Sequence, residues 1–187
     1  MSRTLALMAS GPVLIMSLPA NDPALADAAA RGGADVLKIH IRVHHDASGT
    51  HFGTLAEERA RIARILDCFP GPVGIVAGAV DSATPQEMDE LAALGIDFFD
   101  LYASLMPAWM WRETRMARAA ALEPGFTLHQ VSALEALGAD LLEAAIIPHD
   151  QYGTPLTVAD LAAYRDLRDH TGLPLIVPSQ RAIRPED

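Results

Sequence analysis

The chain repeats a Gly-x-Asp tripeptide at three points, each time between an amphipathic stretch and an apolar run. A glycine in this position supplies the left-handed cap with which many helices end before a short connection to a strand. The repeat therefore predicts that helices and strands alternate, as they do in α/β proteins. The three copies are Gly33-Ala34-Asp35, Gly95-Ile96-Asp97 and Gly138-Ala139-Asp140.

The segments around these tripeptides divide into predicted strands and helices. Apolar runs bounded by turn residues predict strands, and a capping threonine followed three positions later by Glu predicts helix starts at Thr54 and Thr84. Strands are predicted over 13–18, 35–41, 73–78, 96–102, 126–131, 141–147 and 174–178. Helices are predicted over 2–9, 23–32, 54–68, 84–94, 107–121, 132–138 and 157–171.

Strands that are joined by helices run parallel, and a parallel sheet either fans into a doubly wound sheet or closes into a barrel. A doubly wound nucleotide-binding fold carries a glycine-rich loop after its first strand. Here that position holds Ser17-Leu18-Pro19-Ala20-Asn21, which contains no glycine. We therefore expect one α/β domain over residues 1–187 with the fold of a TIM (β/α)8 barrel.

A barrel of this type has eight strands, and seven are visible in the sequence. Arg184-Pro185-Glu186-Asp187 is typical of the first turn of a helix rather than of its end. We therefore expect the C-terminal end of the barrel, a further helix with the eighth strand and its helix, to be missing from this sequence. The alternative is a natural seven-stranded open barrel or sheet.

Charge and cysteine content narrow the classes of partner and compartment. With 14 Lys and Arg against 24 Asp and Glu, the formal charge is −10, which opposes binding to nucleic acid or to an anionic membrane. Gly11-Pro12 interrupts the N-terminal apolar stretch, which otherwise resembles a signal peptide, and no later segment reaches the length of a membrane span. Cys68 is the single cysteine, so we expect no internal disulfide and a cytoplasmic protein.

Lys38, the only lysine, falls inside the second predicted strand. Alternate residues of a strand share a face. A buried ammonium needs a partner or a lowered pKa, which suits a lysine to act as a base, an electrophile or a Schiff-base amine. The alternative is a structural lysine that an interior carboxylate neutralises. The alternation directs Leu37, Ile39 and Ile41 to the helices, and Lys38, His40 and Arg42 into the barrel.

The same alternation selects carboxylates that face Lys38. On the fourth predicted strand it places Asp100 and Tyr102 inside, and on the sixth it places Glu143 inside. These carboxylates either tune the lysine and shuttle protons or form an ion-pair layer that only fills the barrel. Asp97 stands at a strand entrance, so we expect it to serve a loop or cap, because barrels keep catalysis at the C-terminal end.

The polar segment 43–53 follows the second predicted strand and carries three of the seven histidines. Long loops at this edge of a barrel commonly hold function. One histidine can do acid–base work near neutral pH while Ser48 offers a donor to an anion. Alternatively, a divalent metal is bound, although no motif such as HExxH is present; a third reading is a solvated loop held by its own hydrogen bonds. The candidates are His40, His44 and His45, with His149-Asp150 for the metal.

Further candidates for substrate contact stand at the ends of other predicted strands. Loops after strands seven and eight commonly form the phosphate site of (β/α)8 enzymes, so donors there predict an anionic substrate. Arg181 as a surface residue is the alternative. A cluster around Trp109 and Trp111 predicts helix packing or a contact in a homo-oligomer. On the fifth predicted strand, Thr127 and His129 are expected to face inward. All the contact candidates are Ser17, Asn21, Arg42, His44, His45, Ser48, Tyr102, His129, His149, Ser179, Gln180 and Arg181.

The interior lysine on strand two, the Gly-Ala-Asp punctuation and the donors after strand seven resemble the phosphate-binding (β/α)8 superfamily. This group includes ribulose-phosphate epimerases, orotidine-phosphate decarboxylase-like enzymes and barrels of tryptophan and histidine biosynthesis. The chain is similar to the decarboxylase type at Lys38, but Gly74-Ile75-Val76-Ala77-Gly78 stands where that type has Asp-x-Lys-x-x-Asp. It is similar to the epimerases at Ser17 and His40, but it lacks their paired metal-binding aspartates.

Three functional hypotheses remain open. The first is a lyase or isomerase that acts on a small phosphorylated or carboxylated carbohydrate-like substrate. Its catalytic residues are Lys38, His40, Asp100 and Glu143, and it requires no cofactor. The second is an epimerase or hydrolase that uses a divalent metal bound by the loop histidines. The third is a non-catalytic small-molecule-binding barrel, because the fold alone does not determine function.

Overall fold

The computed structural model describes residues 2–45 and 48–184. The chain divides into two compact units, Met1–Arg118 and Ala119–Asp187, each built around parallel strands. The assignment of 1–187 to a single domain stays a prediction.

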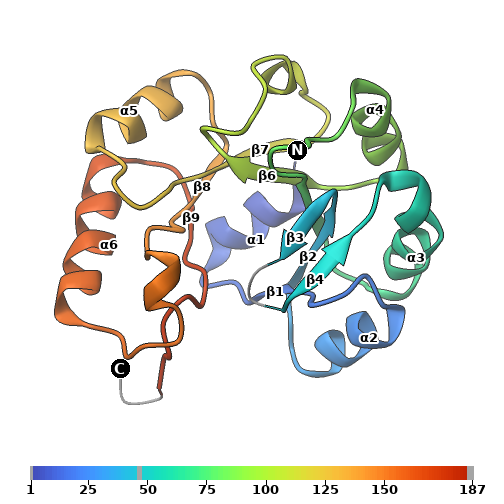
Figure 1. Cartoon of the computed structure of the whole chain (residues 1–187), viewed down its shortest axis with the longest axis horizontal. Helices are drawn as coiled ribbons and strands as arrows, with labels where there is room; N and C mark the ends of the chain where they lie inside the picture. The colour runs from blue at the N-terminus through green and yellow to red at the C-terminus, as the bar shows by residue number, and fades with distance from the viewer. Residues whose placement is uncertain (1, 46–47, 185–187) are drawn as a thin grey trace. The chain divides into compact units, whose positions relative to one another are not determined.

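In the first unit, four parallel strands follow one another in chain order, and a helix connects each to the next (Figure 1). Each strand lies within its predicted range, because turn residues bound every one of these apolar runs. The strands are β1 (Ile15–Ser17), β2 (Val36–Ile41), β5 (Val73–Ala77) and β6 (Phe98–Tyr102). The connecting helices are α2 (Pro23–Arg31), α3 (Leu55–Cys68) and α4 (Pro85–Leu94), and α1 (Arg3–Ser10) precedes them.

The Gly-x-Asp tripeptides end helices as predicted. Their glycines have φ angles of 87°, 93° and 90° at positions 33, 95 and 138, and these left-handed values favour glycine. Asp97 accepts hydrogen bonds from the Ser2 hydroxyl (2.6 Å) and from the backbone N–H groups of Arg3 (2.8 Å) and Thr4 (2.9 Å). It therefore caps α1, as expected for a residue at a strand entrance.

The helix-facing side of the first unit forms one apolar core. The side chains that alternation directs toward the helices are fully buried there and pack with residues of α3 and α4. Burial of this area is the main stabilising contribution to the unit. The core includes Leu37, Ile39, Ile41, Phe99 and Leu101 from the strands, with Ile62, Ile65, Met88 and Leu91 from the helices.

The second unit holds three parallel strands and two helices. The strands are β7 (Ala117–Ala121), which begins at the end of the first unit, β8 (Leu141–Glu143) and β9 (Leu175–Ile176). The helices are α5 (Leu128–Ala136) and α6 (Val158–His170), and a short 3-10 helix, η2 (His149–Gln151), follows β8.

Two sequence predictions are wrong around β7. The predicted helix 107–121 contains only a 3-10 turn, η1 (Met110–Arg112), followed by β7. The alanines of β7 are buried, and a strand that is covered on both sides carries a continuous apolar run that resembles a helix. The predicted strand 126–131 is instead the start of α5, because Thr127 and Gln130 form a capping box.

The strands order as β1-β2-β5-β6-β7-β8-β9, and the N–H of Ala117 at the start of β7 donates to the carbonyl of Asp97 (2.9 Å). This is the strand order of a (β/α) barrel, so the α/β fold class is as predicted. The described part of the chain contains seven strands of this kind. Among the described residues, no helix is long and apolar enough to cross a membrane.

Candidate active site

The candidate site lies in the first unit, on the side of the sheet that faces away from the helices. Strand pairing aligns Ser17 with Lys38, and Lys38 with Gly74. One level nearer the carboxyl ends of the strands, it aligns His40 with Val76, and Val76 with Asp100. The register thus brings polar side chains from β1, β2 and β6 to one end of the sheet. This is the end where barrels hold their active sites.

Lys38 and Asp100 form a buried ion pair across three neighbouring strands. The Lys38 Nζ atom lies 3.2 Å from Asp100 Oδ2. Lys38 is 7% exposed and Asp100 is 1% exposed. Removing one member of such a pair leaves an uncompensated charge in the interior, which is strongly destabilising. The two residues therefore depend on each other in the interior.

An aromatic ring lies in the same interior layer as this pair. Gly74 stands between Lys38 and Phe98 in the register, and a Cβ at position 74 would meet the Phe98 ring at 2.1 Å. The ring therefore occupies the space that a side chain of residue 74 would take. Phe98 is fully buried. An apolar neighbour of this kind keeps the local dielectric low and strengthens the attraction between charges.

His40 is held from two sides. Its ring Nε2 lies 3.4 Å from the Ser17 hydroxyl. The Asn21 side chain continues the strand ladder beyond β1: its Oδ1 accepts from the His40 N–H (3.2 Å), and its Nδ2 donates to the His40 carbonyl (2.7 Å). Asn21, predicted from its place after the first strand, therefore fixes the backbone of His40.

The His40 imidazole is neutral at neutral pH. Burial, then the neighbouring His45 and then Lys38 lower its pKa well below 6.5. Its Nδ1 is buried and has no hydrogen-bond partner among the described residues. In the resting state the neutral imidazole adds no second positive charge beside the Lys38 ammonium. It can accept a proton during a reaction.

The polar segment after β2 is a hairpin rather than a loop. Its strands β3 (Val43–His45) and β4 (Thr50–Phe52) pair antiparallel. The His45 and Phe52 rings lie 4.6 Å and 4.7 Å from the His40 ring. Ser48 Oγ is 2.8 Å from His45 Nδ1. His44 alternates to the opposite face and is exposed, so the hairpin brings His45 to His40 and leaves His44 outside.

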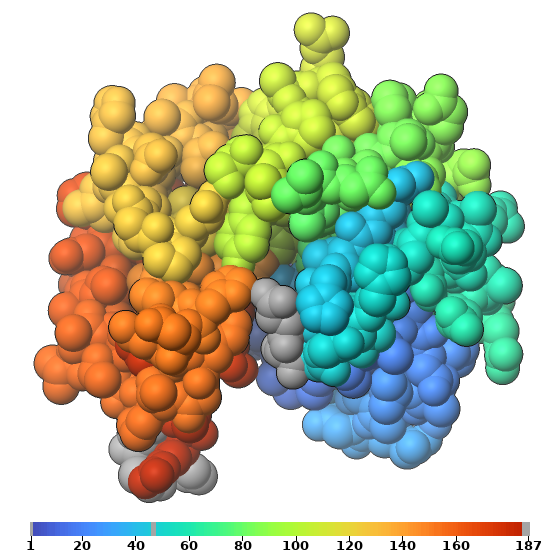
Figure 2. Space-filling model, viewed as in Figure 1, coloured from blue at the N-terminus to red at the C-terminus, as the bar shows by residue number. Residues whose placement is uncertain are grey.

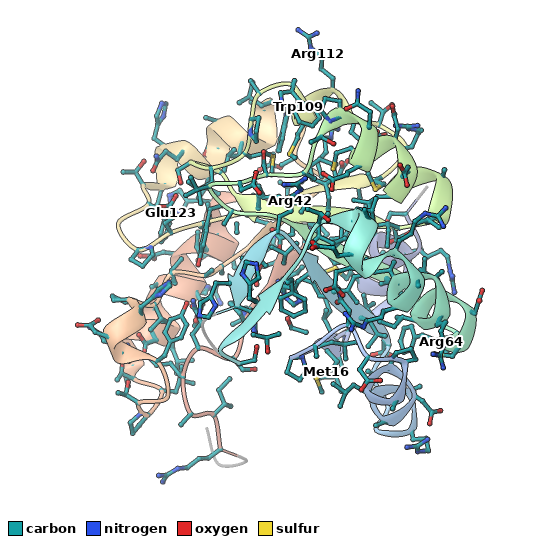
Figure 3. All side chains as sticks on the ribbon, turned by 45° about the vertical axis from the view of Figure 1, so that its right-hand side comes forward. Met16, Arg42, Arg64, Trp109, Arg112 and Glu123 are labelled. Atoms are coloured by element: carbon teal, nitrogen blue, oxygen red, sulfur yellow. The ribbon has the colours of Figure 1, made fainter. Side chains whose placement is uncertain are left out.

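Arg42 does not continue the inner face of β2, contrary to the prediction. Its φ of 54° breaks the alternation, and its N–H donates to the Gly53 carbonyl (2.7 Å) to close the hairpin. The guanidinium pairs with Glu87 (2.9 Å) and Asp81 (2.6 Å) near the start of α4 (Figure 3). The hydrogen bond to Glu87 is the main reason that the pKa of Arg42 is raised.

The remaining candidates on β6 and in the second unit are placed as follows. Tyr102 ends β6 and is half-buried, and Glu143 is buried at the end of β8. The prediction for His129 is wrong, because it lies exposed on α5 instead of on a strand. His149 is exposed, with its ring 4.9 Å from that of Tyr152. The catalytic role of Glu143 stays a prediction.

The donors after β9 are used within the second unit. Gln180 accepts from the Ile147 N–H (3.2 Å) and donates to the Tyr152 hydroxyl (2.5 Å). Arg181 donates to Asp160 (2.8 Å) and to the Gln151 side chain (2.9 Å). These bonds tie the segment to η2 and to the start of α6, so the main donors of the predicted phosphate site are already engaged. Ser179 is exposed.

Sequence reasoning missed Glu58, which lies 7% exposed beside Asn21. The signal was present, because Glu58 shares the helical face of Leu55, Ile62 and Ile65, and a charge in an apolar stripe marks a special position. Over the described ranges, no three His, Cys, Asp or Glu side chains gather as a metal site would require.

Comparisons with known proteins bear on the fold. Neither a scan against protein-family models nor a search of the curated proteins finds a match. A solved structure described as a mandelate racemase/muconate lactonizing enzyme from Roseiflexus sp. is similar, with a TM-score of 0.54 and 17% sequence identity. The similarity covers 91% of this chain and 48% of that one, so this chain spans about half its length. It supports a barrel-type (β/α) fold and gives no support to the phosphate-binding superfamily.

Proposed function

We propose that this protein is a lyase or isomerase that moves a proton on a small carboxylated, carbohydrate-like substrate, with the Lys38 ammonium as the electrophile. The observation that carries this proposal is the buried pair of Lys38 and Asp100 on the inner face of the sheet, with Nζ and Oδ2 3.2 Å apart. A buried charged pair beside a neutral histidine is typical of sites that move protons, although ion-pair networks of purely structural use also occur.

In this proposal, the ammonium of Lys38 acts as an electrophile. Removing a proton next to a carboxylate or carbonyl places negative charge on oxygen, and a fixed cation in a dry site stabilises that charge. Asp100 keeps Lys38 protonated between turnovers. His40, neutral and in contact with Ser17, takes up the proton in this proposal.

Two observations favour a carboxylated over a phosphorylated substrate. Arg181 and Gln180, the donors expected to bind phosphate, are engaged within their own unit. The similar solved structure is described by two activities named after mandelate and muconate, which are both carboxylates. The acidic charge and the single cysteine support a cytoplasmic protein that has a small anionic substrate and no nucleic-acid or membrane partner.

The test is exchange of substrate protons with solvent. The protein is incubated in D2O with a panel of small 2-hydroxy and 2-keto carboxylates, and loss of the α-proton signal is followed by NMR. Lys38→Met should reduce exchange by at least about 100-fold. The Lys38→Met/Asp100→Leu double variant, which removes both charges of the pair, should be equally inactive and fold normally. Arg165→Gln on α6 is the matched control.

Three outcomes are informative. Exchange that Lys38→Met leaves unchanged would show that the lysine is structural. Binding of a panel member with no exchange at any pH would favour the non-catalytic small-molecule-binding barrel. If borohydride traps a keto substrate on Lys38, the lysine acts by forming a Schiff base. That outcome would overturn its role as a charged electrophile.

A further inference from the structure

A cavity of about 440 Å³ lies in the first unit. Three segments line it: the connection between β1 and α2, strand β4 and helix α3. Figure 2 shows the hairpin and α2 on the visible face of this unit. Neither Lys38 nor Asp100 lines the cavity, but Asn21 and Phe52, which contact His40, do, so the cavity adjoins the candidate active site without including the ion pair. Its volume is within the range of small-molecule sites.

We propose that this cavity binds a small carboxylate that also carries a hydroxyl or amino group. One wall is cationic. Arg61 and Arg64 lie on successive turns of α3 and both line the cavity (Figure 3 labels Arg64). Over the described part of the chain, the Arg64 side chain makes no ion pair or hydrogen bond. A guanidinium offers five donors in a planar fork that matches a carboxylate.

The floor of the cavity supplies the opposite charge. Glu58 is 7% exposed. It accepts from Asn21 Nδ2 at 3.2 Å and from Arg61 at 3.4 Å. A carboxylate can accept about four hydrogen bonds, so Glu58 retains capacity for a hydroxyl or ammonium donor. Asp22, the other acidic residue of the lining, is instead used as the cap of α2, where it accepts from the Ala24 N–H (2.8 Å).

These two walls together select a bifunctional ligand. A simple anion would satisfy the arginines but place its charge near Glu58. A simple cation would satisfy Glu58 but meet Arg61 and Arg64. A hydroxy- or amino-carboxylate presents its carboxylate to the arginines and its donor to Glu58, so each charged group of the cavity gains a partner.

The Asn21 amide connects this cavity to a measurable reporter. The same Nδ2 that donates to Glu58 also donates to the His40 carbonyl. A ligand that engages Glu58 should therefore shift the backbone amide resonance of His40 as well as the Arg64 side-chain signal. This gives a readout of site occupancy that does not depend on catalysis.

The experiment is a titration followed by NMR at constant ionic strength, with malate, aspartate, succinate and inorganic phosphate as probes. Malate and aspartate should bind at least about tenfold more tightly than succinate, which lacks the hydroxyl or amine. Arg64→Gln should weaken malate binding at least about tenfold. Arg59→Gln, on the same helix but paired with Glu90, is the matched control and should bind normally.

Glu58 is buried, so Glu58→Gln is used only after its fold has been checked by circular dichroism; it should remove the preference for malate over succinate. In the Lys38→Met/Asp100→Leu double variant, malate should still shift the Arg64 side-chain signal, which separates this site from the proposed catalytic one. Equal binding of all four anions, or malate binding that Arg64→Gln leaves unchanged, would overturn the proposal.

Discussion

Each unit contains a buried ion pair, but the two pairs are formed in different ways. In the first unit, Lys38 and Asp100 lie 62 positions apart and meet through the register of three strands. In the second unit, Arg181 and Asp160 lie 21 positions apart, and further bonds to Gln151 and Thr154 tie the same loop together. A buried ion pair is therefore no sign of a site by itself. What distinguishes the first unit is that its pair is formed across strands and has a histidine with a lowered pKa in the same layer of the sheet.

The largest expected effect is the loss of one member of the buried pair. Asp100→Ala leaves the Lys38 ammonium buried, and it should lower the free energy of unfolding by about 3–5 kcal/mol. Urea denaturation measures this change. The Lys38→Met/Asp100→Leu double variant should recover most of the loss, since neither charge remains. A cost below about 1 kcal/mol for Asp100→Ala would contradict a dry, mutually dependent pair.

The interior layer beside the pair should be nearly as sensitive. Gly74→Ala places a Cβ at 2.1 Å from a rigid aromatic ring, so strand or ring must move, at a cost of about 1–3 kcal/mol. Phe98→Leu in the same chain makes room and should restore part of the stability. If Gly74→Ala unfolds at the wild-type urea concentration, the ring does not occupy the space assigned to it.

The pair in the second unit should tolerate change better. Asp160→Ala removes the N3 carboxylate of the α6 capping box and one partner of Arg181, but Thr157 still caps α6 and Arg181 keeps its bonds to Gln151 and Thr154. We expect a loss of about 1–2 kcal/mol in the free energy of unfolding. Proton exchange by the first unit should stay at the wild-type rate. A loss as large as that of Asp100→Ala would remove the contrast between the two units.

A smaller effect should appear with pH. The pKa of His40 is lowered in the folded protein, mainly by burial and then by His45 and Lys38, whereas the unfolded chain binds that proton near pH 6.5. The contribution of His40 to the free energy of unfolding should therefore be fully present above pH 6.5. It should fall as the pH drops toward the folded pKa, by up to about 1.4 kcal/mol per pH unit. His40→Gln should flatten this slope, and His170→Gln on α6 should keep it. An unchanged slope in His40→Gln would contradict the burial of a neutral imidazole.

The sequence predicts the first unit well because its signals are local. The alternation along 35–41 separates Leu37, Ile39 and Ile41 from Lys38 and His40, and the structure keeps this division. The alternation fails at Arg42, where a positive φ turns the side chain away from the inner face. No feature of the sequence predicts this φ. The prediction also fails at β7, because buried alanines carry no strand signal of their own.

The partner of Lys38 could be narrowed to inward-facing carboxylates but not chosen among them. Which strands lie next to each other and at what level is set by register, a property of the assembled sheet rather than of any one segment. The hydrogen bonds between Asn21 and the His40 backbone, and the burial of Glu58, likewise arise only when the strands and helices have packed together. The local pattern therefore predicts which face of a strand each side chain occupies, and the pairing of the strands determines which side chains come into contact.

The most direct test of the central claim is the rate of α-proton exchange in D2O, measured side by side for the wild type, Lys38→Met/Asp100→Leu and Asp160→Ala. The account predicts that the double variant folds and loses exchange by at least about 100-fold while Asp160→Ala exchanges at the wild-type rate. A folded double variant that exchanges as fast as the wild type would contradict it.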